Sequence, residues 1–456
     1  MKFRLILTLS LLTIFFGFSQ ETSQSFSLQE AIDYALEHNK NVKAAKLDIE
    51  AAKQQKWETT TIGLPQVSAN IEYQNFIEQG SAFLPAILLS DQLRNDLGLG
   101  IEDQFPAVFG TSQNINATVT LNQLIFDGSY IVGLQSAKVF LEISKNAKEK
   151  TELEIRKAVI DAYGNVLLAE ESVTILERNI SVLQKNLDET TKIYENGLEE
   201  EESVEQLQIT LAGVQSNLKN TLRLKNLAYQ MLNITLGLDV NSNTTITDNL
   251  ESLTSRNIVL SLLSADEDVT NTIDYKIAAN DKESKELLLK LEKSKALPTL
   301  SAFINGGYTG NSESFTFLDR SQQWFGSSLF GVSLNVPIFS SGKRSAATKR
   351  ARINLEKSEA DLNDTEQQLK LQVAAAKGDY QFSIEDYENK KQNLNLAERI
   401  EKKNQTKYFE GIASSFELRQ AQVQLYTSQQ EFLQAMLNVI TKKTELETVL
   451  NEIPKN

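Results

Sequence analysis

The 456-residue chain contains no cysteine, one histidine and six prolines. The absence of cysteine excludes disulfide bonds, thiolate metal sites, a catalytic cysteine and a lipid anchor on an N-terminal cysteine. The one histidine, His38, lies in a helical pattern and is typical of a surface residue. Zinc sites and Ser-His-Asp hydrolysis need more histidine, or a better placed one. No cluster of acid, base and nucleophile stands out, so we expect no catalytic centre, no metal site and no cofactor.

Long hydrophobic runs are also missing after the first 20 residues. Residues 1–20 begin with Lys2 and Arg4, continue through an apolar run to Phe18 and end in Ser19 and Gln20, which is typical of a secretory signal peptide. No later run of 18 apolar residues predicts a membrane-spanning helix, so a membrane protein with this sequence would have to be a β-barrel. The formal net charge of −14 argues against a nucleic-acid partner.

The two halves of the sequence resemble each other over domain-sized lengths. Three matched pairs of segments carry this duplication: 41–69 with 274–302 (offset 233), 121–126 with 334–339 (offset 213), and the Tyr-x-x-Gly pattern at 194–197 with 408–411 (offset 214). A unit of this size is too long for a solenoid repeat and indicates a duplicated module. The 20-residue difference between the first two offsets falls between residues 69 and 121, which marks a loop because loops tolerate changes in length.

Most of each half is predicted to be long helix. Between residues 129 and 194 there is no proline, and apolar positions in both halves are spaced by alternating steps of three and four residues. This average of 3.5 is typical of a coiled-coil seam, and its first run is Leu176, Ile180, Leu183, Leu187, Thr190 and Tyr194. The glycines Gly197 and Gly411 allow the chain to reverse, because glycine tolerates the left-handed conformation at a helix end. Each half therefore contains an antiparallel helical hairpin.

Four segments alternate between apolar and mostly small or polar residues, which predicts strands. The apolar members are Val67, Ala69, Ile71 and Tyr73; Ile115, Ala117, Val119 and Leu121; Leu300, Ala302 and Ile304; and Phe330, Val332, Leu334, Val336 and Ile338. A soluble sheet with one buried face is the alternative interpretation. The Asn-, Thr-, Ser- and Gln-rich second face, the aromatic residues at the strand ends and the signal peptide favour a membrane barrel.

Four strands cannot close a barrel, and open edges in lipid leave unpaired backbone groups. The chain must therefore oligomerise; two copies give eight strands and three give twelve. An eight-stranded barrel is filled by side chains, whereas a larger ring encloses a channel. The long hairpins need a central space, which favours three copies.

These patterns predict the following order along the chain. We expect a signal peptide at 1–20, a first repeat at 21–240, a polar mixed segment at 241–270 and a second repeat at 271–456. Within the repeats we expect strands at about 64–76 and 112–126, a helical hairpin at about 129–238, strands at about 297–308 and 328–339, and a second hairpin at about 342–452. The segments between paired strands, 75–112 and 309–326, are expected to be loops.

The ordered set of motifs resembles the TolC-like outer-membrane efflux factors. It comprises the opening Ser27-Leu-Gln-Glu-Ala-Ile-x-x-Ala-Leu-x-x-Asn39, two Leu-Pro-x-x-Ser-Ala strand starts, two Ile-Phe strand ends and two Tyr-x-x-Gly tips. No single motif is specific, but together they cover the chain after the signal peptide. The resemblance implies a mainly α fold with membrane β structure: a trimeric α-helical barrel joined to a 12-stranded trans-subunit β-barrel with four strands per chain. The 241–270 segment corresponds to the family's equatorial region.

The resemblance also implies a function. Such a protein is the passive exit duct of a tripartite efflux or type I secretion system, in the outer membrane of a Gram-negative bacterium and extending into the periplasm. The implied partners are two further copies of the chain, outer-membrane lipid, a periplasmic adaptor (membrane fusion protein) and an inner-membrane RND or ABC pump. The residues leave open which pump and which cargo.

The family's periplasmic gate is a narrowing near the helical tips that is lined by acidic residues. In the Tyr-x-x-Gly frame, the two ring positions fall on Glu417 and on Gln420, which has lost the charge, and the first-repeat partner positions fall on Glu202 and Ser203. A solvated helix end is the alternative reading of the acidic run that ends at Glu202, because acids favour a helix N-terminus. The turns implied to contact the adaptor are Asn196, Gly197, Leu198, Glu410, Gly411 and Ile412.

The main alternative function is that of a soluble periplasmic coiled-coil adaptor. Adaptors of that kind contain one hairpin and small soluble β-barrels. Two hairpins and four strands of bilayer length favour the duct.

Overall fold

The computed structural model describes residues 24–264 and 268–452. The predicted signal peptide, 1–20, lies outside these residues. The chain forms two compact units, a helical unit (residues up to 51, 142–282 and from 358) and a sheet unit (52–141 and 283–357). Each unit takes segments from both halves of the sequence, so the compact units do not coincide with the two sequence repeats.

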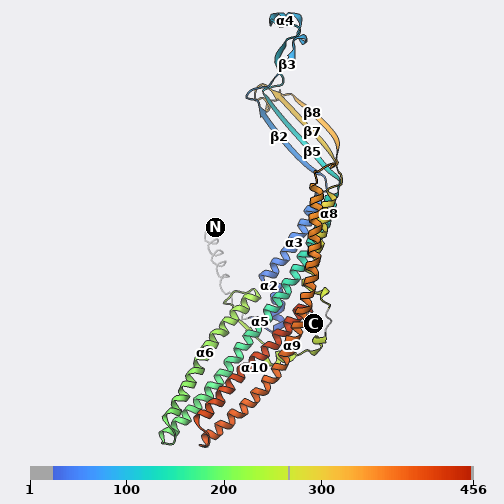
Figure 1. Ribbon diagram of the computed structural model, residues 1–456. Coiled ribbons are helices and arrows are strands. Elements are labelled where there is room, and N and C mark those ends of the chain that lie inside the picture. Colours follow the sequence, from blue (N-terminus) through green and yellow to red (C-terminus); the bar gives the residue numbers. More distant parts are fainter. Residues whose placement is uncertain (1–23, 265–267, 453–456) are drawn as a thin grey trace, which may run out of the picture. The chain divides into compact units, whose positions relative to one another are not determined.

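The helices include two long antiparallel pairs (Figure 1). The long helices are α5 (Gly128–Glu195), α6 (Glu201–Leu236), α9 (Lys343–Phe409) and α10 (Ser415–Leu450). The others are α2 (Leu28–His38), α3 (Lys40–Thr61), α7 (Leu250–Arg256) and α8 (Ile273–Ser294). An offset of 214 residues superimposes the bounds of α6 on those of α10 and the end of α5 on the end of α9. The duplicated hairpins therefore match residue by residue.

In the helical unit the long helices lie in the order α6, α5, α10, α9 (Figure 1). An ion pair joins each neighbouring pair: Lys225–Glu170, Arg156–Glu447 and Lys390–Glu431. Apolar residues from all four helices and from α2 and α7 form the main core, which is centred on Tyr163 and Tyr380. The edges of this helical row are thus α6 and α9, and near the tips α9 also bonds directly to α5.

The mixed segment after α6 packs onto this core. It contains β6 (Thr244–Ile246), which pairs in parallel with β1 (Gln24–Phe26), followed by α7 and the short 3-10 turns Leu260–Ser264 and Val269–Asn271. Two buried tyrosines hold it in place. Tyr163 Oη donates to Asp248 Oδ2 over 3.1 Å, and Tyr380 Oη donates to the Asn257 carbonyl over 2.6 Å.

The sheet unit contains a four-stranded antiparallel sheet in the order β2-β5-β7-β8. Its strands are β2 (Gln66–Asn75), β5 (Gln113–Asp127), β7 (Thr299–Ser312) and β8 (Trp324–Asn335). Where we expected β8 to reach 339, it ends at Asn335, because Pro337 lacks the N–H that would continue the ladder. The second loop is shorter than expected, since the β7–β8 pairing continues to Gly310 and Trp324.

The first loop, expected at 75–112, contains ordered elements. Its strands β3 (Ser81–Pro85) and β4 (Gln104–Val108) form a two-stranded sheet that encloses a 3-10 turn (Ala86–Leu88) and α4 (Asp91–Asp96). The 20 residues by which this loop exceeds its repeat counterpart therefore have a hairpin of their own.

Candidate gate, hairpin tips and sheet surface

The tip of each hairpin is a glycine turn. Gly197 and Gly411 adopt positive φ angles of 75° and 69°. The next backbone N–H, that of Leu198 or Ile412, donates to a carbonyl in the last turn of the preceding helix, over 3.1 Å and 2.8 Å respectively. The side chains of Leu198 and Ile412 are 79% and 69% exposed. Two apolar residues are thus presented at equivalent tips.

All six residues predicted at the tips are exposed. Besides the glycines and the two apolar residues they are Asn196 and Glu410. The Asn196 side chain donates to the Lys192 carbonyl over 2.6 Å, which adds to the cap of α5. The tips are therefore hydrogen-bonded turns whose residues are exposed.

Glu417 starts α10 in a reciprocal cap with Ser414. The Ser414 hydroxyl accepts from the Glu417 N–H over 3.3 Å, and the Glu417 carboxylate accepts from the Ser414 N–H over 2.9 Å. The backbone N–H and hydroxyl of Ser414 lower the pKa of the exposed Glu417 carboxyl. The signature Ser-x-x-Glu in the sequence could have indicated this capping role.

The other predicted gate positions have different environments. Gln420 is exposed, and so is Glu202, whose carboxylate accepts from Gln206 over 2.8 Å. Ser203, by contrast, is buried, and its hydroxyl donates to Glu199 Oε1 over 2.7 Å. The structure thus separates these four residues into an exposed set (Glu202, Glu417 and Gln420) and one buried residue.

A polar cluster that sequence reasoning missed joins the two hairpins just above the tips. The Tyr408 hydroxyl lies 3.2 Å from Thr190 Oγ1 and donates to Glu199 Oε2 over 3.4 Å. Because Glu199 also accepts from Ser203, this tip cluster links the first hairpin to α9. Burial raises the pKa of the Tyr408 hydroxyl, so it stays a neutral donor.

Two further polar pairs lie along the same junction. Gln405 of α9 donates to Asn186 of α5 over 2.9 Å, and Asn179 of α5 donates to Gln429 of α10 over 2.8 Å. Asn179 and Asn186 lie beside the predicted seam positions of α5 and are not among them. The final seam residue was also predicted wrongly: Tyr194 is 39% exposed in the last turn of α5.

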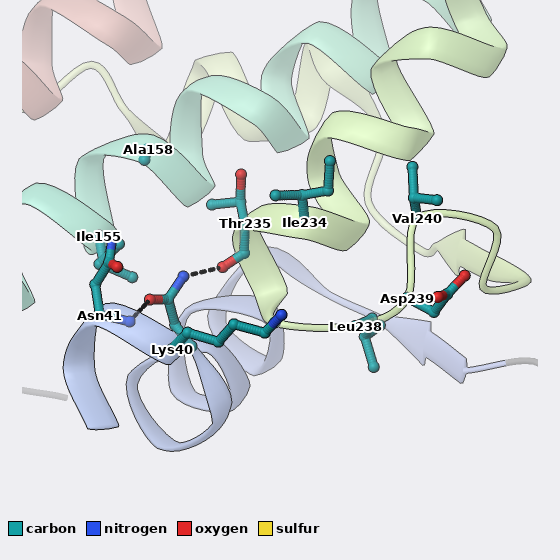
Figure 2. Close-up of a pocket in the computed structure, with 11 residues that line it drawn as sticks. Lys40, Asn41, Ile155, Ala158, Ile234, Thr235, Leu238, Asp239 and Val240 are labelled. Carbon is teal, nitrogen blue, oxygen red and sulfur yellow. Dashed lines mark hydrogen bonds between the residues drawn. The ribbon is translucent and has the colours of Figure 1, made fainter. Parts of the chain in front are cut away.

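A pocket of about 650 Å³ lies where α2 meets α3 and α6 ends (Figure 2). Asn39 bridges it, donating from Nδ2 to the Thr235 carbonyl and accepting from the Asn41 N–H at 2.8 Å each. Gly237 ends α6 with φ at 87°, so close to His38 that an added Cβ would lie 2.7 Å from the His38 carbonyl oxygen. The lining carries polar contacts of a structural kind and no paired acid and base.

The four-stranded sheet has two chemically different faces. One face carries exposed apolar side chains, namely Val67, Ile71, Tyr73, Val119, Ile304, Tyr308, Phe330, Val332 and Leu334. The other is mainly polar, although it also carries Phe325 and Leu329 of β8. A chain of side-chain hydrogen bonds runs across it from Asn114 to Asn311 and from Thr309 through Asn116 back to Asn114. The apolar face has the composition of a lipid-facing surface and the polar face that of an aqueous lining.

Residues 24–264 and 268–452 lack two features that other membrane and metal-binding proteins have. None of the helices there is apolar and long enough to cross a bilayer. The same residues contain no group of three or more His, Cys, Asp or Glu side chains placed to hold a metal ion.

The chain matches the model of the outer membrane efflux protein family over residues 31–238 and 278–452. It belongs to this family. As a member it is an outer-membrane exit duct of a tripartite efflux system in a Gram-negative bacterium and extends into the periplasm. No curated protein sequence matches the chain.

Several solved structures share the fold at low sequence identity. The channel protein CusC has a TM-score of 0.73 at 16% identity, covering 96% of this chain and 95% of its own. The outer membrane protein VceC of Vibrio cholerae has a TM-score of 0.70 at 16% identity, over 93% and 95%. The open-state outer membrane channel MtrE of Neisseria gonorrhoeae has a TM-score of 0.70 at 17% identity, over 93% and 88%. The predicted fold class, two helical hairpins and four strands built by duplication, is confirmed.

Proposed function

We propose that three copies of this chain form a passive duct, in which their sheets close a twelve-stranded barrel and their hairpins a helical barrel. The main support for this proposal is that both edges of the four-stranded sheet are unpaired in the described part of the chain. Within the described residues β2 pairs only with β5 and β8 only with β7, so each edge of the sheet offers free backbone groups. In lipid such groups cost several kcal/mol each, and closure with neighbouring copies satisfies them.

The tip cluster supports a gate in this duct. Tyr408 of the second hairpin bonds to Thr190 and Glu199 of the first, so the two hairpins separate only when these hydrogen bonds break. Two exposed carboxylates follow members of this cluster in the sequence: Glu417 comes nine residues after Tyr408, and Glu202 three residues after Glu199. Threefold symmetry would bring three copies of each around one axis. Clustered carboxylates in a narrow mouth raise the local concentration of cations. The proposed gate therefore combines the neutral hydrogen bonds of the tip cluster with an acidic, cation-attracting rim.

The two glycine turns are the proposed contact with a periplasmic adaptor, which in turn recruits an inner-membrane pump. What supports this is that Leu198 and Ile412 are both exposed and that each follows a glycine turn of the same conformation. Replacing Gly197 or Gly411 with a bulky residue should strain the positive φ and block assembly with the pump while the trimer persists.

The proposal is tested with the mature protein purified from outer membranes. We expect a trimer that resists dissociation in cold detergent, dissociates on heating, and conducts ions in planar bilayers. The alternative, a soluble periplasmic coiled-coil adaptor, would fractionate with the periplasm and remain monodisperse in plain buffer. A folded, monomeric, non-conducting protein would refute the duct.

A further inference from the structure

The joint between the two hairpins, where α5 packs on α10, contains a buried amide pair. Asn179 of α5 donates to Gln429 of α10 over 2.8 Å, and the two side chains are 6% and 8% exposed. On the same pair of helices, the Leu437 side chain of α10 lies against Gly164 of α5, where an added Cβ would be 2.5 Å from Leu437 Cδ1. This α5–α10 joint holds the two halves of one chain together.

The 214-residue offset of the duplication maps this joint onto the two free edges of the helical row. It takes α5 to α9, and takes α10 back to α6. The amide pair then maps onto Asn393 of α9 and Gln215 of α6, with both residue types retained. Here, however, both residues are exposed. The same pair of residue types is thus present twice in the sequence, but only the Asn179–Gln429 pair forms a hydrogen bond within the described chain.

The glycine of the joint is also repeated, although its partner changes, because Leu437 maps onto Arg223 of α6. Gly164 maps onto Gly378 in the middle of α9. A Cβ added at Gly378 would meet no atom within 4 Å, so no contact within the chain requires glycine at this position. Glycine weakens a helix interior, and room for a side chain of a neighbouring helix is a physical reason for it to be there.

A third pair changes its chemistry in a way that fits a contact between chains. Lys157 and Glu445, 3.7 Å apart, form an ion pair across the α5–α10 joint. Their equivalents are Leu371 of α9 and Met231 of α6, which are 70% and 54% exposed. Two large apolar side chains left in solvent at matching positions of opposite edges would cover each other if the edges met.

We infer that α9 of one subunit docks on α6 of the next copy in the same geometry as α5 docks on α10 within a chain. Asn393 then hydrogen-bonds to Gln215 of the neighbouring copy, Gly378 leaves room for the Arg223 side chain of that copy, and Leu371 packs against its Met231. This inference rests on the proposed trimeric duct and adds its residue register. The occupant of both edges is a second copy of the chain.

The sheet unit supplies an independent instance of the same rule. Within the chain β5 pairs with β7, and Leu121 opposes Ile304. The duplication offsets of 213 and 233 carry this pair onto Leu334 of β8 and Ile71 of β2, the two free strands. Both lie on the apolar face, so the transferred register keeps that face continuous around a closed ring.

The cysteine-free chain allows a direct test by crosslinking. Two variants, Gln215→Cys/Asn393→Cys and the matched control Asn217→Cys/Asn393→Cys, are treated as intact trimers with a short bismaleimide and run on denaturing gels. Asn217 is exposed on the same helix, but its repeat equivalent, Glu431, bonds to Lys390 of its own hairpin and not to α5. We expect bands at two and three chain masses at least tenfold stronger for the first variant.

A charge exchange tests the same contact without crosslinking. Leu371→Lys or Met231→Glu alone should lower the temperature at which the trimer dissociates. The double variant should recover it, because it recreates the ion pair seen inside the chain.

The failures are distinguishable. If trimers form but the Gln215→Cys/Asn393→Cys variant links no better than its control, or the charge exchange shows no recovery, the register is wrong and the duct proposal stands. If the unmodified protein forms no trimer, the proposed function itself fails.

Discussion

Removing the hydroxyl of Tyr408 tests whether the tip cluster holds the gate closed. The Tyr408→Phe change keeps the buried ring and its packing but removes the hydrogen bonds to Thr190 and Glu199. Intramolecular hydrogen bonds of this kind contribute about 1–2 kcal/mol net, since in the open state the freed groups bind water. In a trimer the loss occurs three times, about 3–6 kcal/mol. At about 1.4 kcal/mol per factor of ten, the ratio of closed to open channels should fall by about 10²–10⁴.

The assay is single-channel recording in planar bilayers, with the open probability as the readout. Tyr194→Phe is the matched control, because Tyr194 is the repeat equivalent of Tyr408 and its side chain is 39% exposed. We expect it to behave like the unmodified channel. If Tyr408→Phe and Tyr194→Phe have the same open probability while both trimers dissociate at the normal temperature, the tip cluster does not hold the gate.

Three further predictions concern charge and backbone conformation. Glu417→Gln should reduce the cation selectivity of the closed pore without loss of stability, because glutamine also completes a capping box; unchanged reversal potentials in a salt gradient would contradict it. Gly237→Ala should lower the free energy of unfolding by about 2–3 kcal/mol, because the position has a positive φ and the added Cβ would clash with the His38 carbonyl. Gly213→Ala is the control, because its added Cβ meets open space in a helix and should not lower the free energy of unfolding. Thermal unfolding of the two variants distinguishes them. Burial raises the pKa of Glu401, so its contribution to stability is present below the ordinary carboxyl pKa and is lost as the pH rises through the folded-state pKa. Glu401→Gln should therefore gain stability relative to the unmodified protein between acidic and neutral pH, and a constant difference in thermal midpoint would refute this.

The sequence predicts the fold class because each strand and helix carries its periodicity locally. Val67, Ala69 and Ile71 alternate with polar neighbours, and the matching segments of the second half repeat the pattern. The end of β8 was placed too late because the alternation continues to Ile338, while the backbone ladder ends before Pro337. Side-chain periodicity reports the faces of a strand and not the extent of its hydrogen bonds.

The tip cluster was harder to predict because its members are far apart in sequence. Thr190 and Tyr408 are 218 residues apart, and Thr190 by itself is only a seam position of ordinary size. The capping role of Glu417 was accessible, since Ser414-x-x-Glu417 has the same form as the Ser27-x-x-Glu30 box that opens α2. Local signals thus identify caps, whereas contacts between hairpins require the register of the folded helices.

The uncapped edges of β2 and β8 have a consequence for biogenesis. A subunit that has been exported but not yet assembled would expose two unpaired edge strands and an apolar sheet face to water. This combination promotes aggregation. Until its edges pair with those of other copies in the proposed trimer, aggregation competes with assembly, so the folding yield should depend on the local concentration of subunits. Variants that assemble slowly should therefore be degraded, and stable unassembled monomers should not accumulate.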